Sequence, residues 1–342
     1  APMTRISATP TGEVGPLMTD YYRRFGEGGF GGIVTEGVYT DAAFSQGYKN
    51  QPGIINDQQE DSWAALIQKV QATGTKVIMQ LMHAGALSQF NRFSVSTGGP
   101  SAVRPKGKQM EIYHGSGDYP VPQEMNEADI ETVIAGFVSS ALRAVNAGAD
   151  GIEIHGANGY LLDQFLTDYT NERTDSYGGS VDARVKLVCE IIARVRQALG
   201  SEATIGIRIS QAKVNDYDHK WRGQVEDAKV IFSSLEKAGA SYIHTTEHEA
   251  DVAAFGEGVS LANLASKFTS LPIIANGSLS ERSRAEAMVT TNQSQFVAIG
   301  KAALGVPDLP RRLLEGHLVQ EFNPGLLLPY ANLESAAAFQ SR

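Results

Sequence analysis

The sequence predicts a (β/α)8 TIM barrel, an α/β fold, and two observations support this fold class. Seven short apolar runs recur along the 342 residues, and each is typical of a strand buried in a parallel sheet. Amphipathic segments with a helical repeat separate these runs. Strands that alternate with helices along almost a whole chain are typical of a closed parallel barrel.

The seven apolar runs give the expected strands, which are Gly32–Gly37, Lys76–Leu81, Gly151–His155, Thr204–Ser210, Tyr242–Thr246, Pro272–Gly277 and Phe296–Leu304. An eighth strand, the first of the barrel, would end at Ala1–Arg5, so we expect it to be truncated at the amino terminus. The chain begins with Ala1 rather than Met, and we therefore expect the native amino terminus to be missing.

Two of the helical segments have clear apolar stripes, which run from Ile130 to Ala144 and from Val185 to Leu199. Several helices are expected to end at a glycine just before the next strand, because glycine tolerates the left-handed conformation that closes a helix. These glycines are Gly74, Gly148, Gly200 and Gly239. A doubly wound open sheet is the rival architecture, but no G-x-G-x-x-G motif follows an early strand.

Composition excludes several classes of protein. The net charge of −9 and the absence of any basic stretch argue against a nucleic-acid partner. No run of 18 apolar residues and no signal peptide is visible, so we expect no membrane segment and a cytoplasmic location. The single cysteine, Cys189, excludes a disulfide framework and an all-cysteine iron–sulfur cluster.

One long insertion interrupts the repeat between the third strand and the next helix. Residues 88–123 are rich in Gly, Ser and Pro and have little periodicity. We expect this segment to be a loop excursion over the mouth of a single barrel domain that spans residues 1–342.

The segment His155-Gly-Ala-Asn158-Gly-Tyr160 is the strongest candidate for chemistry. It follows the apolar strand Gly-Ile-Glu-Ile, so it lies at the carboxyl end of a strand, where barrels place their active sites. His155 and Asn158 can donate hydrogen bonds to an oxygen, and Tyr160 is a weak acid. These groups suit a substrate whose oxygen gains negative charge during reaction. The alternative is a structural histidine flanked by turn residues.

Other strand ends bring further polar residues to the same face. Arg208 lies inside an apolar run and therefore needs an anionic or strongly accepting partner. Gly277-Ser278 and Gly300-Lys301 precede helical segments, and their backbone N–H groups with the lysine would form a phosphate site. For Lys301 the alternative is an ordinary solvated charge. No pair of histidines has a convincing metal-ligand spacing, and we expect no metal.

Seven motifs in order resemble the old yellow enzyme family of flavin-dependent ene-reductases. They are Ala1-Pro-Met-Thr-Arg5, Gly47-Tyr48-x-x-Gln-Pro-Gly, Gln80-Leu-Met-His-Ala-Gly85, His155-Gly-Ala-Asn-Gly-Tyr160, Asn171-Glu-Arg-Thr-Asp-Ser-Tyr-Gly-Gly179, Arg208, and Gly300-Lys301 with Pro307-Asp-Leu-Pro310. The resemblance covers nearly the whole chain and implies a TIM barrel that holds FMN non-covalently.

The resemblance also implies roles for individual residues. Thr4 would bond the flavin O4 atom, Gln80 and Arg208 would hold the pyrimidine edge, and His155 and Asn158 would bind the substrate oxygen while Tyr160 donates a proton. The full set of expected cofactor-binding residues is Pro2, Met3, Thr4, Gly37, Gln80, Arg208, Gly277, Ser278, Gly300 and Lys301, and Tyr48 and Met82 would line the substrate pocket. NAD(P)H would reduce the flavin and leave, after which an activated alkene would use the same site.

The chain departs from the family pattern at three of these positions. Lys301 replaces the usual arginine of the phosphate site, which exchanges a two-pronged donor for a point charge. Met82 stands where one branch has tryptophan, and Thr4 stands where another has a cysteine. The Asn171–Gly179 motif is expected to be structural, a loop braced by Arg173, Asp175 and Tyr177.

Three other functions remain open at this point. They are another FMN-barrel oxidoreductase, a non-flavin aldolase or isomerase that binds a phosphorylated substrate, and simple flavin storage. The expected partner in every case is a small molecule. The sequence leaves open the alkene, the choice between NADH and NADPH, and whether the chain forms a homo-oligomer.

Overall fold

A curved parallel sheet forms the centre of the computed structural model, which describes residues 1–317 and 319–341. The strands follow in the order β1 (Gly32–Val34), β3 (Lys76–Met82), β6 (Gly151–Asn158), β7 (Ile205–Lys213), β8 (Tyr242–Thr246), β11 (Ile273–Asn276) and β12 (Phe296–Ala298). The short strand β2 (Val38–Tyr39) also pairs with β3. Neighbours in sequence are therefore neighbours in space, as in a (β/α)8 barrel.

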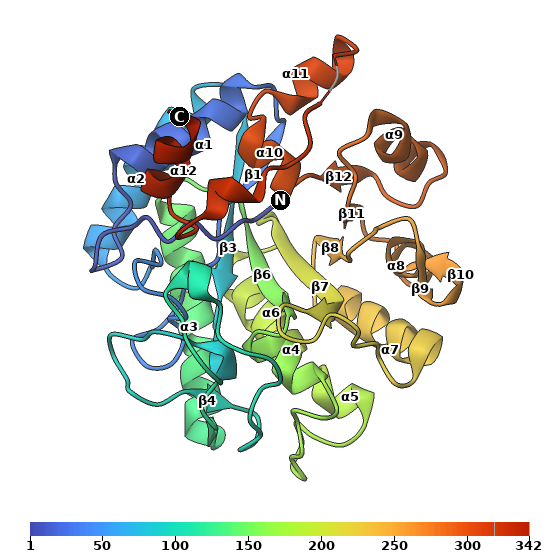
Figure 1. Cartoon of the computed structure of the whole chain (residues 1–342). Helices are drawn as coiled ribbons and strands as arrows, with labels where there is room; N and C mark the ends of the chain where they lie inside the picture. The colour runs from blue at the N-terminus through green and yellow to red at the C-terminus, as the bar shows by residue number, and fades with distance from the viewer. Residues whose placement is uncertain (318, 342) are drawn as a thin grey trace.

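Helices cover the outside of this sheet (Figure 1). They are α1 (Pro16–Glu27), α2 (Asp57–Gln71), α3 (Glu127–Asn146), α4 (Leu161–Leu166), α5 (Val181–Arg184), α6 (Lys186–Leu199), α7 (Gln224–Lys237), α8 (Leu261–Phe268), α9 (Arg282–Thr290), α10 (Lys301–Gly305), α11 (Leu309–Leu314) and α12 (Leu333–Gln340). Phe137 of α3 and Ile192 of α6 are fully buried against the sheet, as their apolar stripes predicted. The four glycines expected to close helices all have positive φ angles between 85° and 99°.

The two outer strands of the sheet, β1 and β12, are not paired with each other in the described part of the chain. The amino-terminal residues lie between them. The backbone nitrogen of Ala1 donates to the carbonyl of Ile299 at 3.0 Å, and that of Arg5 donates to Glu36 at 2.8 Å. Residues 1–5 form no strand, although they lie at the place expected for the end of the first strand.

The sequence placed several strand ends wrongly, and the expected strand Gly32–Gly37 ends already at Val34 in β1. The expected strand Phe296–Leu304 divides into β12, which ends at Ala298, and helix α10, which begins at Lys301. A continuous apolar run is compatible with either a strand or a short buried helix, so its composition did not reveal the boundary. Two other strands, β6 and β7, extend three residues beyond their expected ends.

The insertion 88–123 contains two strand fragments and one helical turn. These are β4 (Gly98–Gly99), which pairs with β5 (Gln123–Glu124), and η2 (Glu111–Tyr113). Tyr119 of this segment is fully buried in a small cluster with Tyr48 and Tyr160, and Met110 and Tyr113 pack against the cluster. The insertion therefore contacts the carboxyl end of β6, where the candidate site lies.

None of the helices in residues 1–317 and 319–341 has both the length and the apolar character that a membrane crossing requires.

Candidate active site

The turn from β6 into α4 carries the three residues expected to perform the chemistry. His155 lies on β6, Asn158 is the last residue of that strand, and Tyr160 is the N-cap of α4. The backbone reverses sharply because Asn158 and Gly159 have φ angles of 64° and 87°. Asparagine and glycine tolerate these positive values better than other residues, so the Asn-Gly sequence permits the turn.

This turn brings the rings of His155 and Tyr160 together, with centroids 5.1 Å apart. Burial and, after it, the nearby Arg208 charge lower the pKa of His155 to about 3, although Glu153 acts in the opposite direction. Burial raises the pKa of Tyr160 well above its usual value of 10. At neutral pH the imidazole is therefore uncharged and the phenol keeps its proton, the states required of a hydrogen-bond donor and an acid.

The expected pocket residues lie in the cluster that surrounds Tyr160. The hydroxyls of Tyr48 and Tyr160 are 2.7 Å apart, and the ring of Tyr113 lies 4.7 Å from that of Tyr48. Met82 is buried in the same cluster, where its sulfur lies 3.8 Å from the Gln51 amide nitrogen. The cluster is therefore apolar on one side and carries several phenol groups, which suits a flat organic substrate.

A second group of polar residues fills the barrel interior beside this turn. The guanidinium of Arg208 approaches Nε2 of His244 at 2.6 Å and donates to Oδ1 of Asn276 at 2.8 Å. Nδ1 of His244 lies 2.9 Å from the carboxylate of Glu153. The amide nitrogen of Gln80 donates to the other oxygen of Glu153 at 2.8 Å. The expected residues Gln80 and Arg208 are thus joined through Glu153 and His244.

Electrostatics fix the charges in this group. Burial alone would raise the pKa of Glu153, but His244 and Arg208 together with the Gln80 bond lower it to about 2. Burial and the Arg208 charge lower the pKa of His244 to about 4. Burial lowers the pKa of Arg208 only to about 10, so it remains charged at neutral pH. Neutral His244 can then donate from Nδ1 to Glu153 and accept from Arg208 at Nε2.

Sequence reasoning did not identify Glu153, His244 and Asn276. A signal was present, because Glu153 and His244 each interrupt an apolar strand and are fully buried. A buried charge requires a partner, and this requirement applies to the glutamate as much as to the arginine.

The four expected phosphate-site residues lie on two adjacent strand ends. β11 pairs with β12 so that Asn276 faces Ala298, which places Gly277-Ser278 beside Ile299-Gly300. Gly277 has a φ of 147°, and a Cβ there would approach the Glu247 carbonyl to 2.5 Å, so only glycine fits. Ser278 and Lys301 are both exposed. An exposed Lys301 can bind an anion, but exposure is equally typical of a lysine that contacts only solvent.

The amino-terminal residues complete this side of the site. A Cβ at Gly300 would lie 3.1 Å from the Met3 sulfur and 3.7 Å from Ala1. Pro2 and Thr4 are half-buried in the same segment. Gly37 lies across the barrel mouth, where a Cβ would approach the Met82 sulfur to 2.4 Å. The expected cofactor residues therefore fall on the carboxyl ends of the strands and on the segment between β12 and β1.

Two buried polar atoms test whether these residues fit a flavin. Among the described residues, Nδ1 of His155 and Nε of Arg208 have no hydrogen-bond partner. A buried polar atom without a partner is costly, and a bound ligand that accepts hydrogen bonds would remove this cost. A cationic guanidinium and a neutral imidazole on one barrel face fit an electron-poor ring system that becomes anionic when reduced.

The Asn171–Gly179 loop has the structural character expected of it. Arg173 donates to the carbonyls of Pro100 and Met125 and to the carboxylate of Asp175. The hydroxyl of Tyr177 donates to Glu190 at 2.8 Å. These bonds tie the loop to the insertion and to α6, away from the His155 turn. The described residues contain no group of three or more metal-ligating side chains that could hold a metal ion.

The parallel (β/α)8 barrel, with a neutral imidazole, a protonated phenol and a buried guanidinium at the carboxyl ends of its strands, has the architecture of a flavin-binding barrel. Residues 1–320 match the model of the NADH:flavin oxidoreductase / NADH oxidase family, and the chain belongs to this family. This confirms the resemblance to old yellow enzymes and implies FMN and a nicotinamide as cofactors.

Individual proteins agree with the family assignment. The chain is 31% identical over 324 residues to an NADH oxidase of Thermoanaerobacter brockii, which covers 92% of this chain. The chain spans only 48% of that oxidase, or about half its length. Among solved structures it resembles morphinone reductase in complex with tetrahydroNAD, with a TM-score of 0.83, 28% identity, and coverage of 95% of this chain and 88% of the other. The old yellow enzyme homologue from Zymomonas mobilis gives a TM-score of 0.83 at 27% identity, with coverage of 94% and 88%.

Proposed function

We propose that this protein is an FMN-dependent oxidoreductase that takes hydride from NAD(P)H and reduces the C=C bond of α,β-unsaturated carbonyl compounds in a ping-pong reaction. The observation that carries the proposal is the pairing of neutral His155 with the protonated Tyr160 at 5.1 Å on the carboxyl face of the barrel. We include in the proposal that residues 1–342 form one FMN-binding barrel domain, that residues 88–123 lie over its mouth, and that the protein is cytoplasmic.

The residues proposed to hold FMN fall into two groups. Gln80, Arg208 and Thr4 would hold the ring system, with Pro2, Met3 and Gly37 beside it. Gly277, Ser278, Gly300 and Lys301 would hold the phosphate through backbone N–H groups and one cation. When bound, FMN would supply the hydride, obtained from NAD(P)H, to the β-carbon of the alkene. The fixed charge of Arg208 would stabilise the negative charge of the reduced ring.

The remaining chemistry belongs to side chains of this chain. His155 and Asn158 would hold the carbonyl oxygen of the substrate and stabilise the charge that develops on it. Tyr160 would pass its proton to the α-carbon. Tyr48, next to Tyr160, and Met82 would line the pocket for the rest of the molecule. Because hydride enters and leaves at the same site, the nicotinamide and the alkene would occupy it in turn.

A half-reaction experiment tests this function. The purified protein should be yellow, and acid precipitation should release FMN into the supernatant. Under anaerobic conditions NADH or NADPH should bleach the flavin, and a cyclic enone such as cyclohexenone should restore its colour. A protein that stays colourless after incubation with FMN would favour an aldolase or isomerase, and bleaching without recovery by any enone would favour another FMN-barrel activity. A flavin that no nicotinamide reduces would favour storage.

A further inference from the structure

We propose that Asp163, held in place by its buried ion pair with Lys213, is a positioning residue that fixes the turn bearing Asn158 and Tyr160 through its bond to the backbone of Gly159. This inference rests on the proposed function, because it concerns how the acid and the oxygen-binding residue of that reaction are held. Neither member of the pair belongs to the expected site. The two side chains join the end of β7 to α4 behind the turn.

Among the ion pairs of the described residues that involve a lysine or an arginine, this one is the most deeply buried. Nζ of Lys213 lies 2.9 Å from both carboxylate oxygens of Asp163, and the two side chains are 2% and 0% exposed. Removing two charges from water is costly, and well-packed apolar residues often give equal or greater stability in such positions. Stability alone therefore does not account for a fully buried pair here.

The contacts of Asp163 indicate what the pair does. Its second oxygen accepts a hydrogen bond of 2.6 Å from the backbone N–H of Gly159. Gly159 is the residue between Asn158 and Tyr160, and its φ of 87° makes the reversal possible. The next side chain on α4, Gln164, donates to the carbonyl of Gly159 at 2.7 Å. Both backbone polar groups of the central turn residue are thus held by α4.

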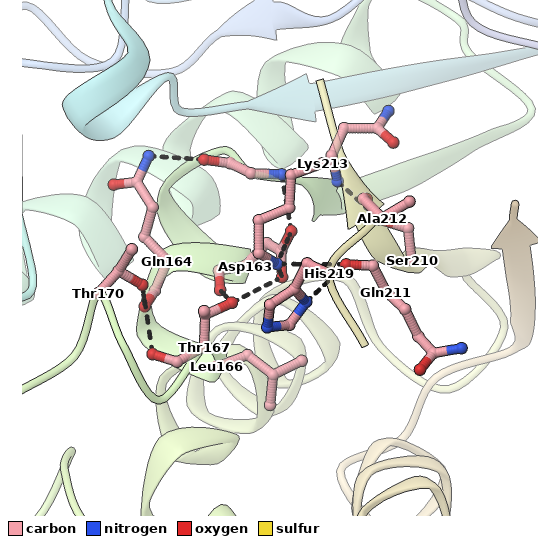
Figure 2. A network of polar contacts seen from close by, with 12 residues as sticks. Asp163, Gln164, Leu166, Thr167, Thr170, Ser210, Gln211, Ala212, Lys213 and His219 are labelled. Atoms are coloured by element: carbon pink, nitrogen blue, oxygen red, sulfur yellow. Dashed lines mark hydrogen bonds and ion pairs between the residues drawn. The ribbon is translucent and has the colours of Figure 1, made fainter. Parts of the chain in front are cut away.

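Strand β7 holds the other side of the turn. The backbone N–H of Asn158 donates to Oγ of Ser210 at 2.8 Å. The backbone carbonyl of Asn158 accepts from the backbone N–H of Val214, the residue after β7, at 3.1 Å. In the pairing of β6 with β7, Asn158 faces Lys213 where the regular register shifts. The ion pair therefore closes a ring of contacts from β7 through Lys213 and Asp163 to Gly159. Figure 2 shows Lys213 and Asp163 with Gln164 and Ser210 among the surrounding polar residues.

Lys213 fixes the carboxylate of Asp163, which accepts the hydrogen bond from the Gly159 N–H. Without the ammonium group, Asp163 would be a buried anion with no cation beside it and would turn towards solvent, and its bond to Gly159 would weaken. The positions of Asn158 and Tyr160 would then relax together. A displacement of about 1 Å in a reacting group can slow a reaction roughly 100-fold, so a loosened turn should affect the step that uses Tyr160.

Four variants separate this positioning role from a contribution to stability. Lys213→Met removes the ammonium group. Asp163→Asn with Lys213→Met removes both charges but keeps an oxygen that can accept from Gly159. Asp163→Ala with Lys213→Met removes both charges and that oxygen. Lys76→Met is the control, since it breaks an ion pair of 2.8 Å with Asp150 at the opposite end of the barrel.

Each variant is loaded with FMN, its thermal unfolding is measured, and the two half-reactions are followed by stopped flow. For Lys213→Met and for the Asp163→Ala double variant, we expect reoxidation by cyclohexenone to slow about tenfold or more. Reduction by NAD(P)H and reoxidation by oxygen should stay within about threefold of the wild-type rates, since neither requires an acid. The Asp163→Asn double variant and Lys76→Met should reoxidise within about threefold of the wild-type rate.

A second measurement does not depend on turnover. Amide hydrogen exchange of the peptide containing Gly159 should be faster in the Asp163→Ala double variant than in the Asp163→Asn double variant, because only the latter keeps the acceptor. The two double variants are both neutral at these positions, so they remain comparable even if Lys213→Met alone does not fold.

The inference is wrong if these two double variants have equal enone reoxidation rates and equal exchange, or if all rates in a variant fall in parallel with its stability. A wild-type protein that is not reduced by NAD(P)H or not reoxidised by an enone would instead overturn the proposed function. In that case the exchange comparison still decides whether the acceptor at position 163 fixes the turn.

Discussion

The hydroxyl of Tyr160 lies 2.7 Å from the hydroxyl of Tyr48, a residue 112 positions earlier in the chain. Both phenols are buried, and burial raises the pKa of each above its ordinary value of 10. The contact with Tyr48 acts in the opposite direction on Tyr160 and lowers its pKa. Tyr48 therefore helps Tyr160 to release a proton when it donates its own hydrogen to the Tyr160 oxygen.

This relationship predicts different effects for two equivalent substitutions. Tyr160→Phe removes the acid and should slow reoxidation by cyclohexenone roughly 100-fold or more, while reduction by NAD(P)H changes little. Tyr48→Phe removes only the supporting bond, worth about 1 kcal/mol, and should slow the same step about fivefold. Stopped-flow traces of both half-reactions measure the difference. Equal slowing of reduction and reoxidation by Tyr160→Phe would show that this tyrosine is structural.

The position of Arg208 gives a prediction for the flavin potential. Arg208→Ala removes a fixed charge that the proposal places beside the reduced ring, an effect on the order of 2–4 kcal/mol. The midpoint potential should fall and reduction by NAD(P)H should slow. Arg208→Lys is the matched control, because it keeps the charge and should retain most of the potential. Spectroelectrochemical titration checks both variants, and an unchanged potential in Arg208→Ala would place the guanidinium away from the flavin.

The side chains near the carboxyl ends of β6 and β11 could be predicted because the information is local. His155 and Gly277 each come at the end of an apolar run, and the end of a parallel strand lies at the carboxyl face of the barrel. This inference needs no contact with residues distant in sequence. The boundary at Gly300 could not be predicted in this way. Residues 296–304 are apolar throughout except for Gly300 and Lys301, and it is the backbone of Gly300 that ends the strand and begins α10.

The side-chain pairs could not be predicted, because they join residues that are distant in sequence. Glu153 and His244 are 91 positions apart, and Asp163 and Lys213 are 50 apart. A sequence indicates that a buried charge such as Glu153 needs a partner, but not which of several strands supplies it. The parallel register decides this, since β7 and β8 place Arg208 directly opposite His244.

The pKa of His155 leads to a prediction for pH dependence. Because burial lowers this pKa to about 3, His155 stays neutral at every pH well above that value, and Tyr160 keeps its proton to beyond pH 10. Neither group changes charge between about pH 5 and about pH 9, so neither should add a break to the pH profile of enone reoxidation over this interval. Glu36 does titrate there, because burial raises its pKa to about 7. Stopped-flow measurements at saturating enone give the profile. A break near the ordinary histidine value of 6.5 that persists in Glu36→Gln would mean that His155 is exposed to solvent in the working enzyme.

The exposed Lys301 gives the last prediction, which concerns retention of FMN. A lysine offers a point charge to a phosphate, whereas arginine offers two parallel donors that match phosphate oxygens. Lys301→Arg should therefore lower the dissociation constant for FMN, and Lys301→Ala should raise it. Because the side chain is exposed, we expect each change to be about fivefold at low salt and smaller at high salt. Fluorescence titration of the apoprotein at two ionic strengths measures both effects. Lys229→Ala, which removes an exposed lysine from helix α7, is the control for net charge. If Lys301→Ala and Lys229→Ala bind FMN equally well, Lys301 is an ordinary surface charge, and the phosphate must be held by the backbone of Gly277, Ser278 and Gly300 alone.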